Sequence, residues 1–171
     1  MRRFRKAALI GVVLCSCVGC DQATKTVAET HLSSSPPVHV MGDVFRLQYS
    51  VNEGAFLGLG AGLPDAVQFW VFTVLVGAAL LGGLGFVWAS QALKHPVDIV
   101  GVSLLIGGGL SNLVDRLLNQ GQVADFLSVG VGNLRTGVFN VADVAIMVGP
   151  GILLVWNLLL RRPDRSTKES A

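Results

Sequence analysis

Four long apolar runs constrain this chain more than any other feature. They cover roughly residues 7–19, 66–89, 97–114 and 138–160, and 51% of the 171 residues are hydrophobic while only 14% are charged. The mean hydropathy of +0.61 is well above that of soluble domains. A helix that spans the hydrocarbon core needs about 20 residues, which the second and fourth runs supply outright. The chain is therefore predicted to reside in a membrane.

The first and third runs reach spanning length when the polar residues at their ends are included. The first continues through Asp21 and Lys25 to about Val27, and the third carries Asp98 near its start and Asn112 near its end. We predict a single integral-membrane domain over residues 1–171 with an all-α membrane core. Its four transmembrane helices are expected at about 7–27, 66–89, 97–116 and 138–160.

The distribution of Lys and Arg predicts the orientation of these helices, because short loops rich in these residues remain in the cytoplasm. With four spans, both termini and the connection after the second helix share one side. That side holds nine of the thirteen basic residues: Arg2, Arg3, Arg5, Lys6, Lys94, Arg161, Arg162, Arg165 and Lys168. Both termini, including the tail 161–171, are expected in the cytoplasm. The net charge of +2 reflects this separation and gives no support for nucleic-acid binding.

Two connections on the outer side, about residues 28–65 and 117–137, are long enough to form structure. Apolar and polar residues alternate from Val44 to Val51, which predicts a half-buried strand and a small sheet at the membrane surface. The glycine-spaced stretch 52–60 is expected to be a loop, because each glycine costs about 1 kcal/mol in a helix interior. The connection 117–137 is also rich in glycine, so Asp125 is predicted to lie on a loop.

Two aspartates beside these apolar runs need an explanation. Asp125 lies in the outer connection, and Asp143 lies near the start of the fourth helix. A charged Asp at the centre of a membrane helix costs about 2.5 to 3.5 kcal/mol, so an acid in or near the bilayer suggests a functional site. The pair is therefore a candidate catalytic dyad.

Other polar residues recur at helical spacing near the same membrane face. Each such group on its own is as well explained by helix ends, which need polar groups to satisfy free backbone amides and carbonyls. Three groups from three helices, together with Asn52 and Asp125, are more simply explained by one common site. The groups are Asp21 with Lys25; Asn112 with Asp115 and Arg116; and Asn140 with Asp143.

Five short segments, in this order and spacing, resemble the bacterial lipoprotein signal peptidase family, also called signal peptidase II, over roughly residues 9–160. Two departures from the family pattern concern packing: Ser111 stands where the family usually has Gly, and the second segment lacks the usual second Ala before Phe56. The segments are Asp21-Gln22-Ala23-Thr24-Lys25, Asn52-Glu53-Gly54-Ala55-Phe56, Ser111-Asn112-Leu113-Val114-Asp115-Arg116, Val123-Ala124-Asp125-Phe126 and Phe139-Asn140-Val141-Ala142-Asp143.

The resemblance implies an aspartic endopeptidase of the bacterial inner membrane with its active site at the periplasmic face. It would remove signal peptides from diacylglyceryl-modified prolipoproteins, cutting on the N-terminal side of the lipidated cysteine, and globomycin-type cyclic peptides would inhibit it. Asp125 and Asp143 would be catalytic, because two close carboxylates that share one proton can activate a water and protonate the departing nitrogen. Which of the two acts as base is left open, since coupled carboxylates titrate as a pair.

The resemblance also assigns supporting residues. Contacts to substrate or to the dyad are expected from Asn52, Gly54, Asn112, Arg116 and Asn140. Asp21 and Lys25 are expected to shape the edge of the site, and Asp115 to form an ion pair with Arg116. From composition alone, Phe56, Leu57 and Leu59 are interpreted as a flap over the site. No metal or cofactor is expected, and the histidines His31, His39 and His95 are scattered.

Two other classes of protein remain as alternatives. The chain could be a small channel or a proton-coupled transporter that uses its acids as a relay. It could also be a lipoprotein lipidated at Cys20, because a basic N-terminus, an apolar run and Val18-Gly19-Cys20 imitate a lipoprotein signal sequence. The second alternative is opposed by Cys17, at a position where a branched aliphatic residue is usual, and by the three further spans.

Overall fold

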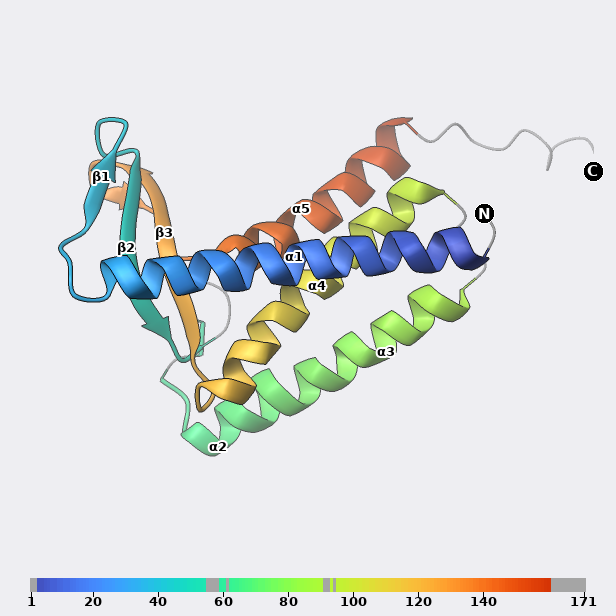
Figure 1. Cartoon of the computed structure of the whole chain (residues 1–171), viewed down its shortest axis with the longest axis horizontal. Helices are drawn as coiled ribbons and strands as arrows, with labels where there is room; N and C mark the ends of the chain where they lie inside the picture. Colours follow the sequence, from blue (N-terminus) through green and yellow to red (C-terminus); the bar gives the residue numbers. More distant parts are fainter. Residues whose placement is uncertain (1–2, 55–58, 61, 91–92, 94, 161–171) are drawn as a thin grey trace, which may run out of the picture.

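Four long helices and a small sheet make up the computed structural model (Figure 1), which describes residues 3–54, 59–60, 62–90, 93 and 95–160. The helices are α1 (Arg3–Leu32), a continuous segment formed by α2 (Asp65–Gln68), η2 (Phe69–Leu75) and α3 (Val76–Ala89), then α4 (Pro96–Leu118), and α5 (Val141–Val155), which η3 (Trp156–Leu160) extends. All four are long and apolar enough to cross a membrane. The predicted membrane core of four helices is confirmed.

The helix ends differ from the expected ones by a few residues. The first helix extends at its outer end to Leu32, and α4 continues to Leu118. In contrast, α5 starts at Val141 and not at 138, because the Asn140 side chain accepts a hydrogen bond from the backbone and ends the extended segment before the helix. Polar residues therefore close the outer ends of the helices.

An antiparallel sheet lies at this end of the bundle (Figure 1). Its strands are β1 (Val38–Val40), β2 (Phe45–Asn52), β3 (Val123–Val131) and β4 (Leu134–Arg135), in the spatial order β1-β2-β3-β4. The predicted strand from 44 to 51 is confirmed as β2. Both of its faces are half-buried over most of its length, so the expected division into a buried and an exposed face is absent.

The prediction that Asp125 lies on a loop was wrong, because it lies within β3. The glycines misled the prediction: Gly121 and Gly132 have positive φ values of 93° and 56° and form the turns on either side of the strand. The residues between them pair with β2, so that Ser50 faces Asp125 and Asn52 faces Val123. Asn52 is likewise the last residue of a strand.

Close packing of α4 against α5 sets the position of the site. A Cβ added at Gly108 would collide with the backbone oxygen of Ala142, and one added at Gly149 would collide with that of Gly101. Small residues thus let the two helix backbones approach each other, as is common in membrane proteins. The polar outer ends of α4 and α5 are thereby brought together, and α1 packs against α4 from another side.

Candidate active site

The structure brings Asp125 and Asp143 together through a shared neighbour, Asn140. The Asn140 Nδ2 donates to Asp125 Oδ1 at 2.7 Å, and the Asn140 backbone N–H donates to Asp143 Oδ2 at 3.3 Å. Both aspartates are buried, with exposed fractions of 1% for Asp125 and 4% for Asp143. Two carboxylates from distant parts of the chain therefore occupy one site.

Local structure explains why Asn140 reaches both acids. Phe139 forms an antiparallel bridge with Leu127, and reciprocal backbone hydrogen bonds of 2.8 and 2.9 Å join these two residues. This bridge lays the chain beside β3 just before α5 begins. Asn140 then caps α5 in a capping box, in which its Oδ1 accepts from the Asp143 N–H at 2.9 Å. The residue that caps α5 therefore also connects the two aspartates.

Each carboxylate receives a second hydrogen bond, in both cases from the side-chain amide of another asparagine. The Asn52 Nδ2 donates to Asp125 Oδ2 at 2.8 Å, and the Asn112 Nδ2 donates to Asp143 Oδ1 at 2.9 Å. Asn52 reaches Asp125 because it lies two residues beyond Ser50, the cross-strand partner of Asp125, and so is a diagonal neighbour on the same face. These four oxygen positions are fixed by donors from β2, α4 and the start of α5.

A buried lysine connects this site to the helices. The Lys25 Nζ lies 2.6 Å from Asp21 Oδ2 and 2.8 Å from Asp115 Oδ2, and it donates to Asn112 Oδ1 at 2.9 Å. Lys25 is only 4% exposed. Because Asn112 accepts from Lys25 through its oxygen, its amide group must face Asp143. Lys25 therefore orients one of the amides that contact the dyad.

Asp21 and Asp115 each hold a backbone amide near the catalytic candidates. Asp21 Oδ1 accepts from the Ala142 N–H at 2.8 Å, in the first turn of α5. Asp115 Oδ2 accepts from the Ala124 N–H at 3.2 Å, immediately before Asp125. The two acids thus do more than shape the edge of the site, since they anchor the segments that carry both members of the dyad.

Two residues in this network had no role in the sequence prediction. The Ser111 hydroxyl donates to Asp21 Oδ2 at 2.7 Å, and the Gln22 Nε2 donates to Asp115 Oδ1 at 2.6 Å and to Ser111 Oγ at 3.2 Å. Ser111 precedes Asp115 by one helical turn, and Gln22 follows Asp21 directly. Both residues lie within the motif segments, which could have marked them as part of the site. Their hydrogen-bond partners lie on other helices, so local spacing could not reveal them.

The predicted ion pair between Asp115 and Arg116 was wrong. Among the described residues, Asp115 forms its ion pair with Lys25. Arg116 instead donates to the backbone oxygen of Gly54 at 2.9 Å and to that of Asn112 at 3.4 Å, and its guanidinium lies 5.9 Å from the ring centre of Phe72. Adjacent residues on a helix point in different directions, so they rarely pair.

Gly54 is held next to the dyad from two sides. Its N–H donates to Asn52 Oδ1 at 2.9 Å, and its carbonyl accepts from Arg116. Of the proposed flap, Phe56 and Leu57 lie outside the described residues, whereas Leu59 is 74% exposed.

The titration of Asp125 is shifted by its surroundings. Burial raises its pKa to about 6, and the negative charge of Asp143 contributes in the same direction, while the hydrogen bonds from Asn52 and Asn140 oppose the shift. Burial disfavours the ionised carboxylate because the charge loses its water. An acid that retains its proton close to neutral pH suits proton transfer to and from a substrate.

Over the described part of the chain, no group of three or more His, Cys, Asp or Glu side chains is arranged to hold a metal ion. Of the three histidines, His31 bonds the Val27 carbonyl, His39 contacts Asp43, and His95 stacks on Trp156 with ring centres 4.2 Å apart. None of these contacts lies in the site around Asp125 and Asp143.

Comparison with known proteins gives a consistent result. The family model described as signal peptidase (SPase) II matches residues 13–160. A lipoprotein signal peptidase from Rhodococcus jostii is 33% identical over 98% of this chain and 79% of its own length. One from Solibacter usitatus is 36% identical over 85% of both chains, and one from Mycobacterium tuberculosis is 34% identical over 90% of this chain and 71% of its own.

Solved structures agree with the fold. A bacterial membrane enzyme with 25% sequence identity superposes with a TM-score of 0.74 and covers 95% of this chain and 92% of its own. A second bacterial membrane enzyme, 23% identical, has a TM-score of 0.73 over 89% of this chain and 94% of its own. The four-helix membrane fold with its small sheet is therefore shared.

Proposed function

Because this chain belongs to the signal peptidase II family and is a membrane aspartic endopeptidase that processes lipoproteins, we propose that Asp125 and Asp143 are its catalytic pair. The observation that carries this proposal is the double contact of Asn140 with both carboxylates. The neighbouring pair of acids, Asp21 and Asp115, is instead bridged by the cation of Lys25. Membership of the family gives the reaction, and the contacts of Asn140 support the choice of Asp125 and Asp143 as the catalytic residues.

The proposed chemistry needs one proton shared by the two carboxylates. One carboxylate removes a proton from a water as that water attacks the scissile carbonyl carbon. The other protonates the carbonyl oxygen, which gives a diol intermediate. As the C–N bond breaks, the proton gained from the water passes to the departing nitrogen, and a hydroxyl of the intermediate returns a proton to the second carboxylate. The raised pKa of Asp125 supports such sharing near neutral pH. We assign the roles to the pair as a whole, since the two groups titrate together.

The surrounding residues would position the dyad and the substrate. Asn52, Asn112 and Asn140 donate to the carboxylate oxygens, which limits the rotation of both acids. Arg116 and Gly54 bond to each other beside Asn52, so they hold the segment that follows β2 next to the dyad. Lys25, Asp21 and Asp115 act one step further away by holding Asn112, Ala142 and Ala124.

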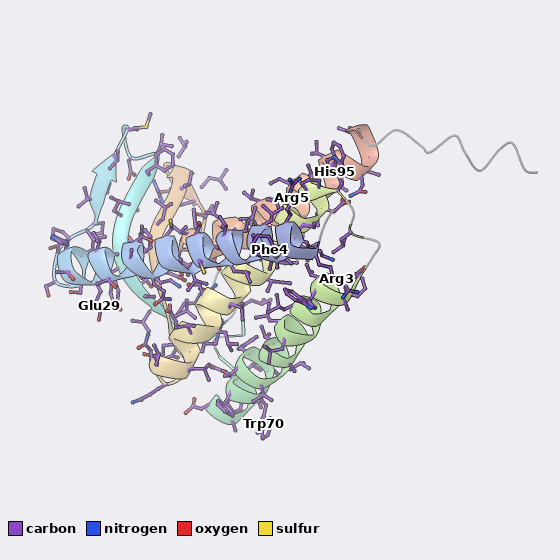
Figure 2. All side chains as sticks on the ribbon, turned by 45° about the vertical axis from the view of Figure 1, so that its right-hand side comes forward. Arg3, Phe4, Arg5, Glu29, Trp70 and His95 are labelled. Carbon is purple, nitrogen blue, oxygen red and sulfur yellow. The ribbon has the colours of Figure 1, made fainter. Side chains whose placement is uncertain are left out.

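The proposed orientation places this site at the periplasmic face of the inner membrane, with both termini in the cytoplasm. Figure 2 supports this by separating the basic N-terminal residues Arg3 and Arg5 from Glu29, which lies at the sheet end of α1. The basic residues 94, 161, 162, 165 and 168 lie outside the described part of the chain. By the positive-inside rule, the basic end is cytoplasmic.

Two tryptophans support the same position in the bilayer. Trp70 and Trp88 are 64% and 65% exposed and lie on the continuous segment Asp65–Ala89. Eighteen residues separate them, which corresponds to about 27 Å of helix and nearly matches the hydrocarbon thickness. Tryptophan prefers the two interfaces. Trp70 then marks the outer interface, the side from which a cysteine anchored by acyl chains would reach the dyad.

Replacement of either aspartate tests the dyad. We expect Asp125→Asn and Asp143→Asn to lower cleavage of a diacylglyceryl-modified precursor by at least about a thousandfold, because neither variant can share the proton. The matched control is Asp65→Asn, an acid at the exposed start of α2. Substantial cleavage by either dyad variant would refute the assignment, provided that both variants are folded in detergent.

Two further expectations belong to this proposal. Globomycin-type cyclic peptides should inhibit the enzyme, and chelators should leave its activity intact because no metal takes part in the proposed chemistry. Cleavage assays with the inhibitor and with EDTA measure both. Loss of activity in EDTA that zinc or magnesium restores would contradict the metal-free dyad.

A further inference from the structure

Two hairpin turns meet at one end of the sheet, far from the dyad along the strands. The register pairs Val40 with Phe45 and Phe45 with Val129, so the turn between β1 and β2 lies beside the turn between β3 and β4. The Gly130 N–H donates to the Val44 carbonyl at 2.9 Å and joins them. Figure 1 shows the first of these turns projecting away from the helices. We call this region the hairpin end: His39, Met41, Arg46, Val131, Leu134 and Arg135.

The hairpin end exposes large apolar side chains. Met41 is 73% exposed, Val131 is 75% exposed and Leu134 is 85% exposed. The sheet does not need these side chains for its own packing, since they contribute little buried surface. Apolar residues gathered on a surface, with polar residues at their rim, are typical of sites that contact another protein or a membrane.

A basic cluster borders these apolar residues. Asp43 accepts two hydrogen bonds from Arg46, at 2.7 and 2.6 Å, and it also lies 3.2 Å from Arg135 and 2.6 Å from His39. Two arginines face a single aspartate, so the cluster retains net positive charge. The Arg135 side chain is 12% exposed and donates to the backbone carbonyls of Asp43, Val44 and Ser128, so it holds the two turns together. The Arg46 side chain is 32% exposed and is the arginine of this cluster that solvent can reach.

Chain connectivity holds the hairpin end close to the bilayer. The strand β1 begins six residues after the end of α1, and α5 begins six residues after the end of β4. Six extended residues span at most about 20 Å. Both α1 and α5 are spanning helices, so the two hairpins are tethered near the level at which these helices leave the membrane.

We propose that the hairpin end is a binding site for anionic phospholipid, in which Met41, Val131 and Leu134 enter the headgroup region while Arg46 binds a lipid phosphate and Arg135 holds the two turns together. Guanidinium groups present several donors to phosphate oxygens and remain charged at all relevant pH values. Basic residues near an anionic membrane surface each contribute to binding. The site would clamp the outer edge of the sheet to the membrane and so keep β3, which carries Asp125, at a fixed height above it.

Lipid is favoured over a protein partner by position and by charge. The short connections to two spanning helices limit how far the hairpins can lie from the membrane surface, where lipid is always present. The positive cluster also complements the phosphate groups that are present there at high local concentration. The proposal depends on the membrane placement of the fold and is independent of the catalytic assignment.

Fluorescence quenching in vesicles tests the site. The full-length chain, with Cys15, Cys17 and Cys20 replaced by Ala, would carry an environment-sensitive fluorophore at Asn133→Cys, in the exposed β3–β4 turn. Acrylamide quenching would be compared in phosphatidylcholine vesicles and in vesicles that also contain phosphatidylglycerol. We expect less quenching with phosphatidylglycerol than without it. In Arg46→Gln the association of the labelled turn with these vesicles should fall about fivefold. A fluorophore at Asn119→Cys, exposed beside the opposite end of β3, is the matched control and should respond equally in both vesicles.

Two further measurements test the site even if replacement of the arginine distorts the turn. Leu134→Ser should reduce the protection of the fluorophore in both kinds of vesicle, and high salt should reduce it only where phosphatidylglycerol is present. Equal quenching of the two fluorophore positions in all vesicles would overturn the proposal. So would protection that appears only after a lipoprotein precursor is added, which would indicate protein docking. The Asp143→Asn variant should show the same lipid dependence, so failure of the dyad assignment is distinguishable from failure of this site.

Discussion

Two clusters of charged side chains occupy the outer region of this protein, and they differ mainly in burial. The first surrounds Lys25, which lies between Asp21 and Asp115 and is 4% exposed. The second surrounds Asp43 at the hairpin end, where the carboxylate is 31% exposed. Both clusters use short ion pairs of 2.6 to 3.2 Å. The contacts look alike, but their energetic consequences differ.

Burial decides the difference because water screens the second cluster and not the first. A buried pair that loses one member leaves a charge without compensation in a poorly solvated place, whereas an exposed pair exchanges its partner for water. The Lys25 cluster also connects α1 with α4 and, through Asp21, with α5. The same residue types therefore form a structural centre in one place and an adaptable surface in the other.

The largest expected effect comes from removal of Lys25. Lys25→Met leaves Asp21 and Asp115 facing each other without a cation, and we expect a loss of about 3 to 5 kcal/mol in the free energy of unfolding. Unfolding in mixed detergent micelles measures this loss. The matched control is Lys6→Met on the same helix, since Lys6 contacts only the Ser90 carbonyl among the described residues, at 2.7 Å. Similar losses in both variants would show that the full burial of Lys25 and its two acidic partners do not set the cost, because Lys6 is only half-buried.

The pH dependence of stability should have opposite signs at Asp125 and Asp43. Burial raises the pKa of Asp125 to about 6, so its contribution to stability is fully present below the unfolded value of about 3.9 and is lost as pH rises through about 6. The hydrogen bond from Arg46 holds the pKa of Asp43 below its ordinary value, so its contribution is present above about 3.9 and is lost as pH falls further.

The free energy of unfolding is measured as a function of pH for wild type, Asp125→Asn and Asp43→Asn. The difference between wild type and each variant isolates the contribution of that aspartate. Between pH 4 and pH 6 we expect wild type to lose stability relative to Asp125→Asn, at about 1.4 kcal/mol for each unit of pKa shift. Asp43→Asn should be flat over that range and diverge from wild type only in stronger acid. Parallel curves for wild type and Asp125→Asn would contradict the burial argument.

Ser111 should have an intermediate effect. Its hydroxyl is fully buried and donates to the charged Asp21 at 2.7 Å, so we expect Ser111→Ala to cost about 1.5 to 3 kcal/mol. Ser103→Ala on the same helix is the matched control. The Ser103 hydroxyl is equally buried but has no hydrogen-bond partner among the described residues, so its removal should be neutral or stabilising. Equal costs would show that packing, and not the bond to Asp21, determines the effect.

The smallest effect is expected for Asp43→Asn at neutral pH. The carboxylate is solvent-accessible, so the loss of stability should be small and should vanish in high salt, where surface ion pairs are screened. Thermal unfolding with and without added salt measures it, and peptidase activity should be unchanged. A large, salt-independent loss would mean that the hairpin end is as tightly organised as the Lys25 cluster.

The sequence identified the residues that contact the dyad better than it identified the strand and the ion pair that hold them in place. The motif segments contained Asp125, Asp143 and the three asparagines that contact them, because chemistry requires those residue types there. The strand β3 was missed because its flanking glycines resemble a loop, although they form its turns. The partner of Asp115 was also missed, because Lys25 lies ninety residues earlier and no local spacing connects the two.

By itself, the sequence determined that the chain has four membrane helices and that a set of polar residues lies at one end of them. Both follow from local rules, since the length of an apolar run and the cost of charge in lipid can be judged along the chain. Only the tertiary structure decided which polar groups meet. The Asp21 carboxylate holds an amide 121 residues away, and Asn140 joins both catalytic candidates, because helix packing and strand register bring distant segments within hydrogen-bond distance.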